Sequence, residues 1–243
     1  MIEPILLAAT PVVTFNGTQP LTNASGFFFE RDGRLFLVTS RHVFVDAPSK
    51  HYPDRIEIEL HVDPDNLADS IGFSIPLYRA GESLWRQGQD SAGEIDVAAI
   101  AIDRAALPAT MVYRAFTPQH LAGPDDPVEV GASLLVVGFP LGFHDTLHHL
   151  PVARHAVIAS SYGLRFKGQG YFLTEARTHR GTSGAPVVMR AAAPDSRHGD
   201  LPWLLLGVHS ARLDVGTRDR VLDEALGLNC AWYPDILLTL TEG

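Results

Sequence analysis

The chain has 243 residues, 46% of them hydrophobic and 19% charged, and its 19 Lys and Arg against 28 Asp and Glu give a formal net charge of -9. A chain of this length and hydrophobic content can bury a sizeable core without covalent cross-links. The acidic balance, with no run of Lys and Arg, argues against a binder of duplex nucleic acid. The single cysteine, Cys230, excludes an extracellular disulfide scaffold.

Strand patterns dominate the first hundred residues. Two β-rich runs flank Arg31-Asp32-Gly33, which predicts a hairpin with a three-residue connection ending in glycine. Further along, Ile56, Ile58 and Leu60 alternate with polar residues, as in a half-buried strand. The predicted strands of this first set are Gly26–Glu30, Arg34–Thr39, Arg55–Val62, Gly72–Leu77 and Ile95–Ile102.

A stretch rich in Ala, Pro, Gly and Asp, from Asp103 to Gly131, separates this set from a second one. Helical periodicity is found only near the end, after Pro234, which can occupy a first helical position. The predicted strands of the second set are Ser133–Phe139, Val152–Ser160, Tyr171–Ala176, Ala185–Met189, Leu204–His209 and Leu228–Trp232.

Many short strands separated by turn residues, with one terminal helix, indicate an all-β fold. Two sets of about six strands predict two packed six-stranded antiparallel β-barrels with a short C-terminal helix. We assign residues 1–110 to an N-terminal barrel, 111–130 to a connector between the barrels, and 131–243 to a C-terminal barrel with its helix.

Three short segments contain the residue types of nucleophilic catalysis, in the order His, Asp, Ser. His42 follows a predicted strand, Asp96 opens another, and Ser183 lies between two more. A catalytic serine needs a base to take its proton, a carboxylate to fix the tautomer of that base, and N–H groups aimed at the developing oxyanion. The pattern predicts Ser183 as nucleophile, His42 as general base and then general acid, and Asp96 as the carboxylate that orients His42.

Glycines flank the serine on both sides. Gly181 can adopt the backbone geometry that turns N–H groups towards one point, and Gly184 lets the chain pass close behind the nucleophile. The N–H groups of Gly181 and Ser183 are therefore the predicted oxyanion hole. Taken alone, each residue has an ordinary interpretation: His42 as a partly buried histidine, Asp96 as a cap at a strand start, and Ser183 as a turn serine. The combination favours catalysis.

The sequence resembles the chymotrypsin/trypsin-like serine peptidases, particularly the compact bacterial glutamyl endopeptidases and HtrA-type protease domains. The resemblance covers nearly the whole chain. It implies two six-stranded barrels with the catalytic residues in the cleft between them, His42 and Asp96 from the first and Ser183 from the second. The motifs that carry it are Ser25-Gly26-Phe27, the Thr-x-x-His segment ending at His42, Ile95-Asp96-Val97-Ala98, Val137-Gly138-Phe139-Pro140, the segment around Ser183, Leu206-Gly207-Val208-His209 and Leu228-Asn229-Cys230-Ala231-Trp232.

The resemblance also implies which residues contact the substrate side chain before the cut bond. A Thr and a His at the corresponding positions resemble the glutamyl-specific members, and arginines nearby add positive potential that favours acidic groups. We therefore predict a preference for Glu, Gln or Asp before the scissile bond. The predicted substrate-binding residues are Arg177, Thr178, Arg180, His209, Ser210 and Arg212.

Several positions remain open on sequence alone. His209 is equally well interpreted as a core histidine, and Ser210 either hydrogen-bonds Asp96, as the corresponding serine of the family does, or faces solvent. Arg41 either projects to solvent or crowds His42. Thr182 replaces the aspartate that pairs with a freed N-terminus in zymogen-activated members of the family, so that ion pair is not available to this chain.

A group of histidines raises the question of a metal site. Their spacing could bring two imidazoles together on a helix, but neighbouring prolines and a glycine disfavour one, and no His-Glu-x-x-His pattern completes the set. We expect solvated loop histidines and no metal. The histidines are His144, His148, His149 and His155.

The leading interpretation is a serine endopeptidase that acts on a protein or peptide substrate through an acyl-enzyme, without cofactor or metal. The alternative is a catalytically silent or partner-activated binding module of the same fold, with a protein regulator as a candidate partner. An esterase of the α/β-hydrolase type is disfavoured, because it requires Gly-x-Ser-x-Gly and places its histidine last in the chain.

The start of the sequence lacks the basic leader and long apolar stretch of a secretory signal, and no run approaches the roughly 20 apolar residues of a membrane span. Together with the single cysteine, this predicts a cytoplasmic protein that has neither a membrane nor a nucleic acid as partner.

Overall fold

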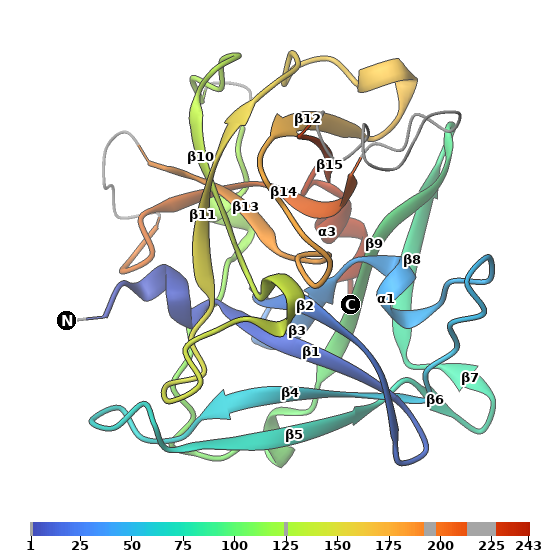
Figure 1. The fold of residues 1–243 in the computed structure, drawn as a ribbon, viewed down its shortest axis with the longest axis vertical. Helices are drawn as coiled ribbons and strands as arrows, with labels where there is room; N and C mark the ends of the chain where they lie inside the picture. Colours follow the sequence, from blue (N-terminus) through green and yellow to red (C-terminus); the bar gives the residue numbers. More distant parts are fainter. Residues whose placement is uncertain (1, 124–125, 192–197, 213–226) are drawn as a thin grey trace.

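A computed structural model describes residues 2–123, 126–191, 198–212 and 227–243. The described chain is mostly β-structure (Figure 1), so the all-β class predicted from sequence is confirmed. The first half contains a seven-stranded antiparallel sheet in the order β5-β4-β1-β2-β3-β9-β8, and the second half forms a closed barrel in the order β10-β11-β12-β15-β14-β13.

The strands of the first half are more numerous than the sequence patterns indicated, because β1 and β8 join the sheet and β6 pairs with β7 in a small separate sheet. A one-turn helix, α1 (Arg41–Phe44), follows β3. The strands are β1 (Ala9–Asn16), β2 (Gln19–Arg31), β3 (Arg34–Thr39), β4 (Arg55–His61), β5 (Ser70–Pro76), β6 (Tyr78–Arg79), β7 (Glu82–Ser83), β8 (Trp85–Asp90) and β9 (Gly93–Ile102).

The closed six-stranded barrel of the second half agrees with the prediction, as does the short terminal helix after Pro234, α3 (Ile236–Leu240). The barrel consists of β10 (Ser133–Gly138), β11 (Val152–Ile158), β12 (Tyr171–Glu175), β13 (Pro186–Arg190), β14 (Trp203–Arg212) and β15 (Leu228–Trp232).

Local sequence explains the main elements. On β4, Ile56, Ile58 and Leu60 are almost completely buried while the residues between them are partly exposed, which is the period of two expected for a strand that faces a core on one side. The β2–β3 hairpin turns through two residues rather than three, because Arg31 pairs with Arg34 and only Asp32 and Gly33 lie between them. Both have positive φ, 51° and 73°, as a tight two-residue hairpin turn requires.

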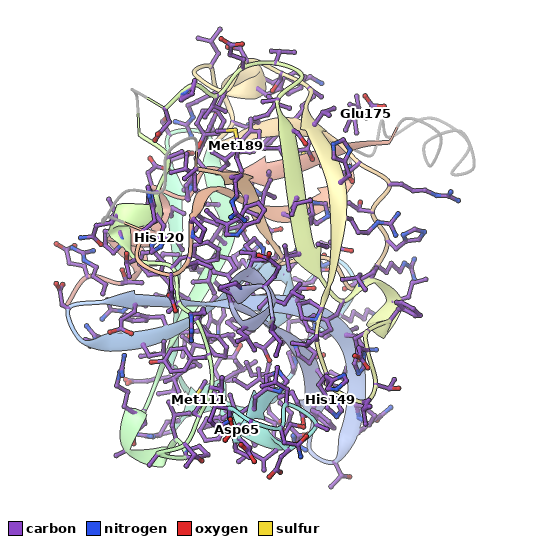
Figure 2. All side chains as sticks on the ribbon, turned by 90° about the vertical axis from the view of Figure 1, so that its left-hand side faces the viewer. Asp65, Met111, His120, His149, Glu175 and Met189 are labelled. Atoms are coloured by element: carbon purple, nitrogen blue, oxygen red, sulfur yellow. The ribbon has the colours of Figure 1, made fainter. Side chains whose placement is uncertain are left out.

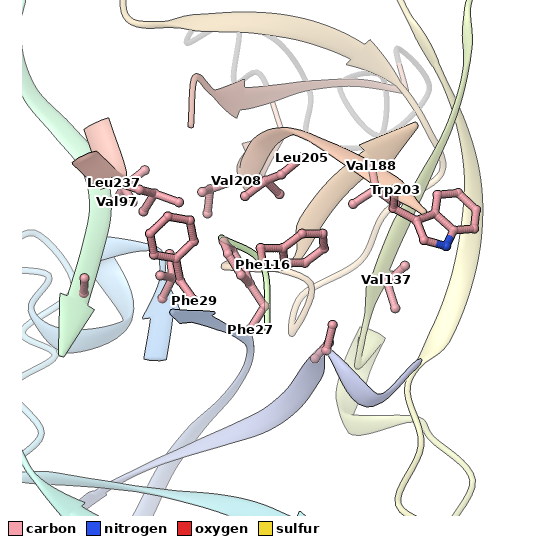
Figure 3. Close-up of a cluster of buried hydrophobic side chains, with 14 of the residues drawn as sticks. Phe27, Phe29, Val97, Phe116, Val137, Val188, Trp203, Leu205, Val208 and Leu237 are labelled. Carbon is pink, nitrogen blue, oxygen red and sulfur yellow. The ribbon is translucent and has the colours of Figure 1, made fainter. Parts of the chain in front are cut away.

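Three groups of buried apolar side chains hold the molecule together. One lies within the first half and one within the second. The third joins the halves: Phe27 and Val97 from the first pack with Leu205 and Val208 from the second (Figure 3). Burying a side chain such as Phe27 contributes roughly 1.5–3 kcal/mol. An interface of this kind fixes the two halves against each other and so fixes any site built between them.

Backbone contacts, one of them across this interface, bring four chain segments together. Thr39 at the end of β3 pairs with Ala98 of β9. The amide of Gly184 donates to the carbonyl of His209 on β14 at 2.7 Å, and the amide of Ser25 on β2 donates to the carbonyl of Ser183 at 2.9 Å. The segments that carry His42, Asp96, Ser183 and Ser210 therefore converge.

Candidate active site

His42 and Asp96 form a two-point contact. The backbone N–H of His42 donates to Oδ1 of Asp96 at 2.9 Å, and Nδ1 of the imidazole lies 2.7 Å from Oδ2 of the same carboxylate. Because β3 and β9 are neighbouring strands, the start of α1 is held directly over Asp96. The carboxylate fixes Nδ1 as the protonated nitrogen, which leaves Nε2 as the basic one.

The electrostatics of this pair support proton transfer at Nε2. Burial lowers the pKa of His42, but the hydrogen bond and negative charge of Asp96 outweigh it, so the pKa is raised above its ordinary value of 6.5. For Asp96, burial raises the pKa, and the hydrogen bonds and charge of His42 together with the hydrogen bond from Ser210 outweigh that effect, so the pKa is lowered. An ionised carboxylate behind the ring stabilises the imidazolium that forms when His42 takes a proton.

Ser210 joins this pair to Ser183. Its hydroxyl donates to Oδ2 of Asp96, and its backbone carbonyl accepts a hydrogen bond of 2.9 Å from the hydroxyl of Ser183. The sequence left open whether Ser210 hydrogen-bonds Asp96 or faces solvent. The structure shows the contact with Asp96, and Ser210 is only 5% exposed. Ser183 makes no hydrogen bond to His42 within the described residues, so its hydroxyl rests on a neighbouring carbonyl rather than on the imidazole.

The loop that carries Ser183 leaves two amides without an acceptor among the described residues. Arg180 offers its carbonyl to the N–H of Leu141 at 2.6 Å, and Gly181 has a φ of 90°. In a trans peptide the C=O and N–H point in opposite directions, so anchoring the Arg180 carbonyl turns the N–H of Gly181 the other way. Neither this amide nor that of Ser183 donates to any group in the described part of the chain, as a pair of oxyanion-binding amides would require.

Gly181 and Gly184 are required by space as well as by backbone angle. A Cβ on Gly181 would lie 2.6 Å from the carbonyl oxygen of Phe139, and one on Gly184 would lie 2.2 Å from that of Ser25. Both glycines also have positive φ, 90° and 85°. Any side chain at either position would displace the loop that carries Ser183.

Ser25 holds this loop from the opposite half of the molecule. Its hydroxyl is fully buried, donates to the carbonyl of Gly181 at 2.7 Å and accepts from the amide of Phe139 at 2.9 Å. Its own carbonyl accepts from the hydroxyl of Thr39 at 2.7 Å. With the bond from its amide to Ser183, one residue of β2 contacts both the loop of Ser183 and the end of β10. We call this set of four hydrogen bonds the Ser25 contact.

The predicted substrate-binding residues do not form one group. Arg177 and Arg180 are exposed, and neither forms an ion pair with a described residue. Thr178 is 5% exposed and donates its hydroxyl to Oδ1 of Asn229 at 2.5 Å. The backbone of Arg212 lies on β14 opposite Asn229, and its side chain lies outside the described residues.

His209 is buried, with 2% of its surface exposed, and its Nδ1 has no partner among the described groups. Burial and the neighbouring His42 lower its pKa to about 4, so this ring is neutral at physiological pH. The side chain of Arg41 is 22% exposed and forms an ion pair of 2.8 Å with Glu94, so it does not project freely into solvent.

Sequence reasoning missed three features of this region. The sequence around Ser25 places it in a motif but gives no indication that its side chain holds the loop of Ser183. Asn229, which is completely buried and accepts from Thr178, sits in a strand where an amide has no special pattern. Leu141 donates its amide to Arg180 from a left-handed conformation with a φ of 55°, which only the folded chain reveals.

Among the described residues, no group of three or more His, Cys, Asp or Glu side chains is arranged to hold a metal ion. His144 stacks on His149, while His148 pairs with Asp145 at 2.6 Å and His155 contacts the hydroxyl of Ser133 at 3.0 Å. In the described part of the chain, no helix has the length and apolar character needed to cross a membrane.

Comparison with known proteins gives consistent results. A sequence model of the trypsin-like peptidase domain matches residues 24–192. No curated protein matches the sequence. Among solved structures, the chain is similar to an HtrA-type protease, AlgW, in a structure with a tripeptide, at 17% identity and a TM-score of 0.56, covering 96% of this chain and 58% of that one.

Two further structures show the same fold. A serine endoprotease from Yersinia pestis has 16% identity and a TM-score of 0.55, covering 97% of this chain and 62% of that one. The active form of a protease from M. tuberculosis has 14% identity and a TM-score of 0.51, covering 98% and 82%. The chain thus spans less than two thirds of the length of the first two.

Proposed function

Because the chain belongs to the trypsin-like peptidase domain family, we propose that it is a serine endopeptidase in which His42, Asp96 and Ser183 form the catalytic triad. The observation that carries this proposal is the two-point contact between His42 and Asp96, which Ser210 extends to the hydroxyl of Ser183. The three residue types that the chemistry requires, in the chain order of the trypsin-like family, are thereby linked through Ser210.

In the proposed reaction, Ser183 Oγ attacks the carbonyl carbon of the scissile bond while His42 Nε2 takes its proton. The N–H groups of Gly181 and Ser183 bind the oxyanion that forms. His42 then gives the proton to the leaving nitrogen, the C–N bond breaks, and the acyl group remains as an ester on Ser183. Water, deprotonated by His42, hydrolyses the ester and restores the serine. Asp96 stays ionised throughout.

The resting hydrogen bond of Ser183 must change before this reaction starts. Its proton points to the carbonyl of Ser210 and not to Nε2 of His42. Pairing between β13 and β14 ends at Val208, and a register shift against β15 between His209 and Arg212 leaves Ser210 unpaired on the other side, so no described strand pairs with the edge of β14 at Ser210. We propose that the acyl half of an extended substrate pairs with this edge, takes over the Ser210 carbonyl, and frees the hydroxyl of Ser183 to rotate onto His42.

The proposal predicts covalent labelling that depends on pH. A fluorophosphonate probe should label the chain on Ser183, because the probe needs an activated serine and an oxyanion site. His42 can act as a base only when it is neutral, and its pKa is raised above 6.5. The labelling rate should therefore be low below this pKa and rise with pH, with its midpoint above 6.5.

The measurement is the labelling rate between pH 5 and 9 with the modified peptide identified by mass spectrometry. Labelling at another residue would contradict the triad, and no labelling at any pH would contradict a peptidase that is active by itself and favour the binding module. A midpoint below 6.5 would show that Asp96 does not stabilise the charged ring in solution.

We also propose that the enzyme prefers Glu, Gln or Asp before the scissile bond. Arg177 and Arg180 support this preference, since both are exposed, unpaired with any described residue and close in sequence to Ser183 in a chain of net charge -9. Thr178 gives its only hydroxyl proton to Asn229, so its oxygen can accept but not donate. This arrangement suits the amide of Gln better than a carboxylate.

Digestion of a peptide library with every residue type at each position should give cleavage mainly after Glu, Gln and Asp. Arg180→Ala should lower kcat/KM for cleavage after Glu and Asp, relative to cleavage after Gln, by about three- to fivefold. The reason is that an exposed charge contact is worth up to about 1 kcal/mol. Arg79→Ala, which removes an exposed arginine on β6, is the matched control. Cleavage mainly after Lys, Arg or large aromatic residues would refute the preference.

One observation supports the alternative that the chain is a catalytically silent or partner-activated binding module. The hydroxyl of Ser183 rests on Ser210, so a partner that shifts it onto His42 could switch the chain from silent to active. The labelling experiment separates the two, because a silent module shows no labelling until such a partner is added. Cys230, free and buried, is compatible with the proposed cytoplasmic location.

A further inference from the structure

A groove of about 570 Å³ lies beside the loop of Ser183 and takes no part in the chemistry above. One wall comes from the loop after β10, with Pro140, Leu141 and Phe143, and the other comes from β11, with Val152 and Arg154. The loop that joins the two strands, where His149 is labelled in Figure 2, packs against β2 through its first turn.

The groove adjoins the proposed oxyanion hole. Leu141, which lines it, donates its amide to Arg180, and the place where a Cβ of Gly181 would sit is 2.9 Å from that same amide. His179, four residues before Ser183, also lines it. The free edge of β14 at Ser210 is the other neighbour of Ser183. A peptide that passes the nucleophile from that edge therefore leaves it towards this groove.

The wall next to Gly181 is unusually apolar for an exposed surface. Leu141 is 67% exposed and Phe143 is 68% exposed, and Leu141 holds its position in a left-handed backbone conformation with a φ of 55°. Large exposed apolar side chains gathered at a concave site indicate a surface that another molecule covers. A substrate segment with an apolar side chain fits this wall.

The opposite wall is basic and offers free backbone groups. Arg154 forms no ion pair with any residue of the described ranges, whereas Arg41 and Arg165 are both paired. β11 pairs with β12 only at Val157 and Ile158, so its residues 152–156 have no partner on that side within the described structure. An unpaired arginine beside an open strand edge, in an acidic protein, is complementary to an extended peptide that carries an acidic group.

From these observations we infer that the groove binds the part of the substrate that follows the scissile bond, and that it selects an apolar residue accompanied by an acidic one. The inference rests on the proposed endopeptidase function, because it assigns the leaving half of the substrate to that site. Leu141 and Phe143 contact the apolar side chain, and Arg154 binds the carboxylate.

The test uses four peptides that share the same residues before the scissile bond, namely those cleaved best in the library. They differ in the two residues after that bond, which are Leu-Glu, Leu-Gln, Leu-Lys or Gly-Glu. A nitroanilide of the same acyl half has no leaving peptide and serves as the reference rate for each variant. For the wild-type chain, kcat/KM should be about tenfold higher for Leu-Glu than for Leu-Lys, with Leu-Gln between them. It should also be several-fold higher for Leu-Glu than for Gly-Glu.

Arg154→Glu should abolish or reverse the difference between Leu-Glu and Leu-Lys, and Phe143→Ser should abolish the difference between Leu-Glu and Gly-Glu. Phe143 is exposed, so its replacement leaves the core intact even if the Arg154 variant folds poorly. Arg79→Glu reverses a charge on β6, and its pattern should match that of the wild type.

A wild-type chain that is labelled on Ser183 but hydrolyses all four peptides equally would overturn the inference and leave the endopeptidase proposal standing. A preference for Leu-Glu that survives in Arg154→Glu would also overturn it. A second copy of the chain could occupy the groove instead. In that case kcat/KM would fall as protein concentration rises, and sedimentation would show a dimer that Arg154→Glu disrupts. That result would also overturn the inference. Absence of labelling would count against the proposed function itself.

Discussion

Replacing Ser183 with alanine should reduce kcat by about a million-fold and abolish fluorophosphonate labelling. The reason is that in the proposed mechanism Ser183 Oγ forms the acyl bond, and neither Ser210 nor Ser25 offers a hydroxyl that can replace it. Ser210 donates its hydroxyl to Asp96, and that of Ser25 is completely buried. The residual rate would come from substrate binding and the oxyanion amides alone.

The measurement is single-turnover hydrolysis of the best library peptide by purified wild type and variant at equal concentration. Ser74→Ala is a suitable control, because Ser74 is exposed on β5 and should leave both kcat and labelling unchanged. A variant at Ser183 that keeps more than about one thousandth of the wild-type rate would show that another residue is the nucleophile.

Replacing Asp96 with asparagine should lower kcat by about ten thousand-fold while the fold is retained. The amide oxygen can still accept from the backbone of His42, but the amide nitrogen now faces Nδ1 and cannot accept its proton. The ring adopts the tautomer with the proton on Nε2, where it cannot take one from Ser183. Loss of the negative charge also removes what raises the pKa of His42, so the pH midpoint of the remaining activity should shift to lower pH.

Glu94→Gln is the matched control for this variant. It removes a carboxylate two residues away, which pairs with Arg41 and is largely exposed, but leaves the contact between Asp96 and His42 intact. Its kcat should stay within a few-fold of the wild type. If Glu94→Gln and Asp96→Asn lose activity equally, the effect would be one of general charge near the ring and not of Asp96 as the orienting group.

The sequence predicted the class of fold and most strands, because apolar alternation is a direct consequence of one buried face. It missed β1, where the buried positions include Thr10 and Thr14 and a proline interrupts the run, so the alternation is not one of apolar and polar residues. It also missed β8, where only Trp85 is buried. Such strands are stabilised by their neighbours in the sheet and not by their own pattern.

The candidate site also contains features that the sequence predicted and features that it did not. His42, Asp96 and Ser183 could be picked out as candidates because nucleophilic catalysis requires these residue types and their chain order resembles that of the trypsin-like family, and their catalytic roles remain predictions. The resting bond from Ser183 to the Ser210 carbonyl could not be predicted, since it depends on a side-chain torsion. The apolar wall of the groove was hidden as well, because exposed leucine and phenylalanine have the sequence signature of core residues.

The Ser25 contact makes the shape of the Ser183 loop depend on both halves of the described structure. Ser25 belongs to β2 in the first half, and the loop that it holds belongs to the second half. Separation of the two halves would break the hydrogen bonds that Ser25 makes to Gly181, Phe139 and Ser183. If Ser183 is the nucleophile, partial unfolding would therefore disorder the amides beside it while the serine itself is still present.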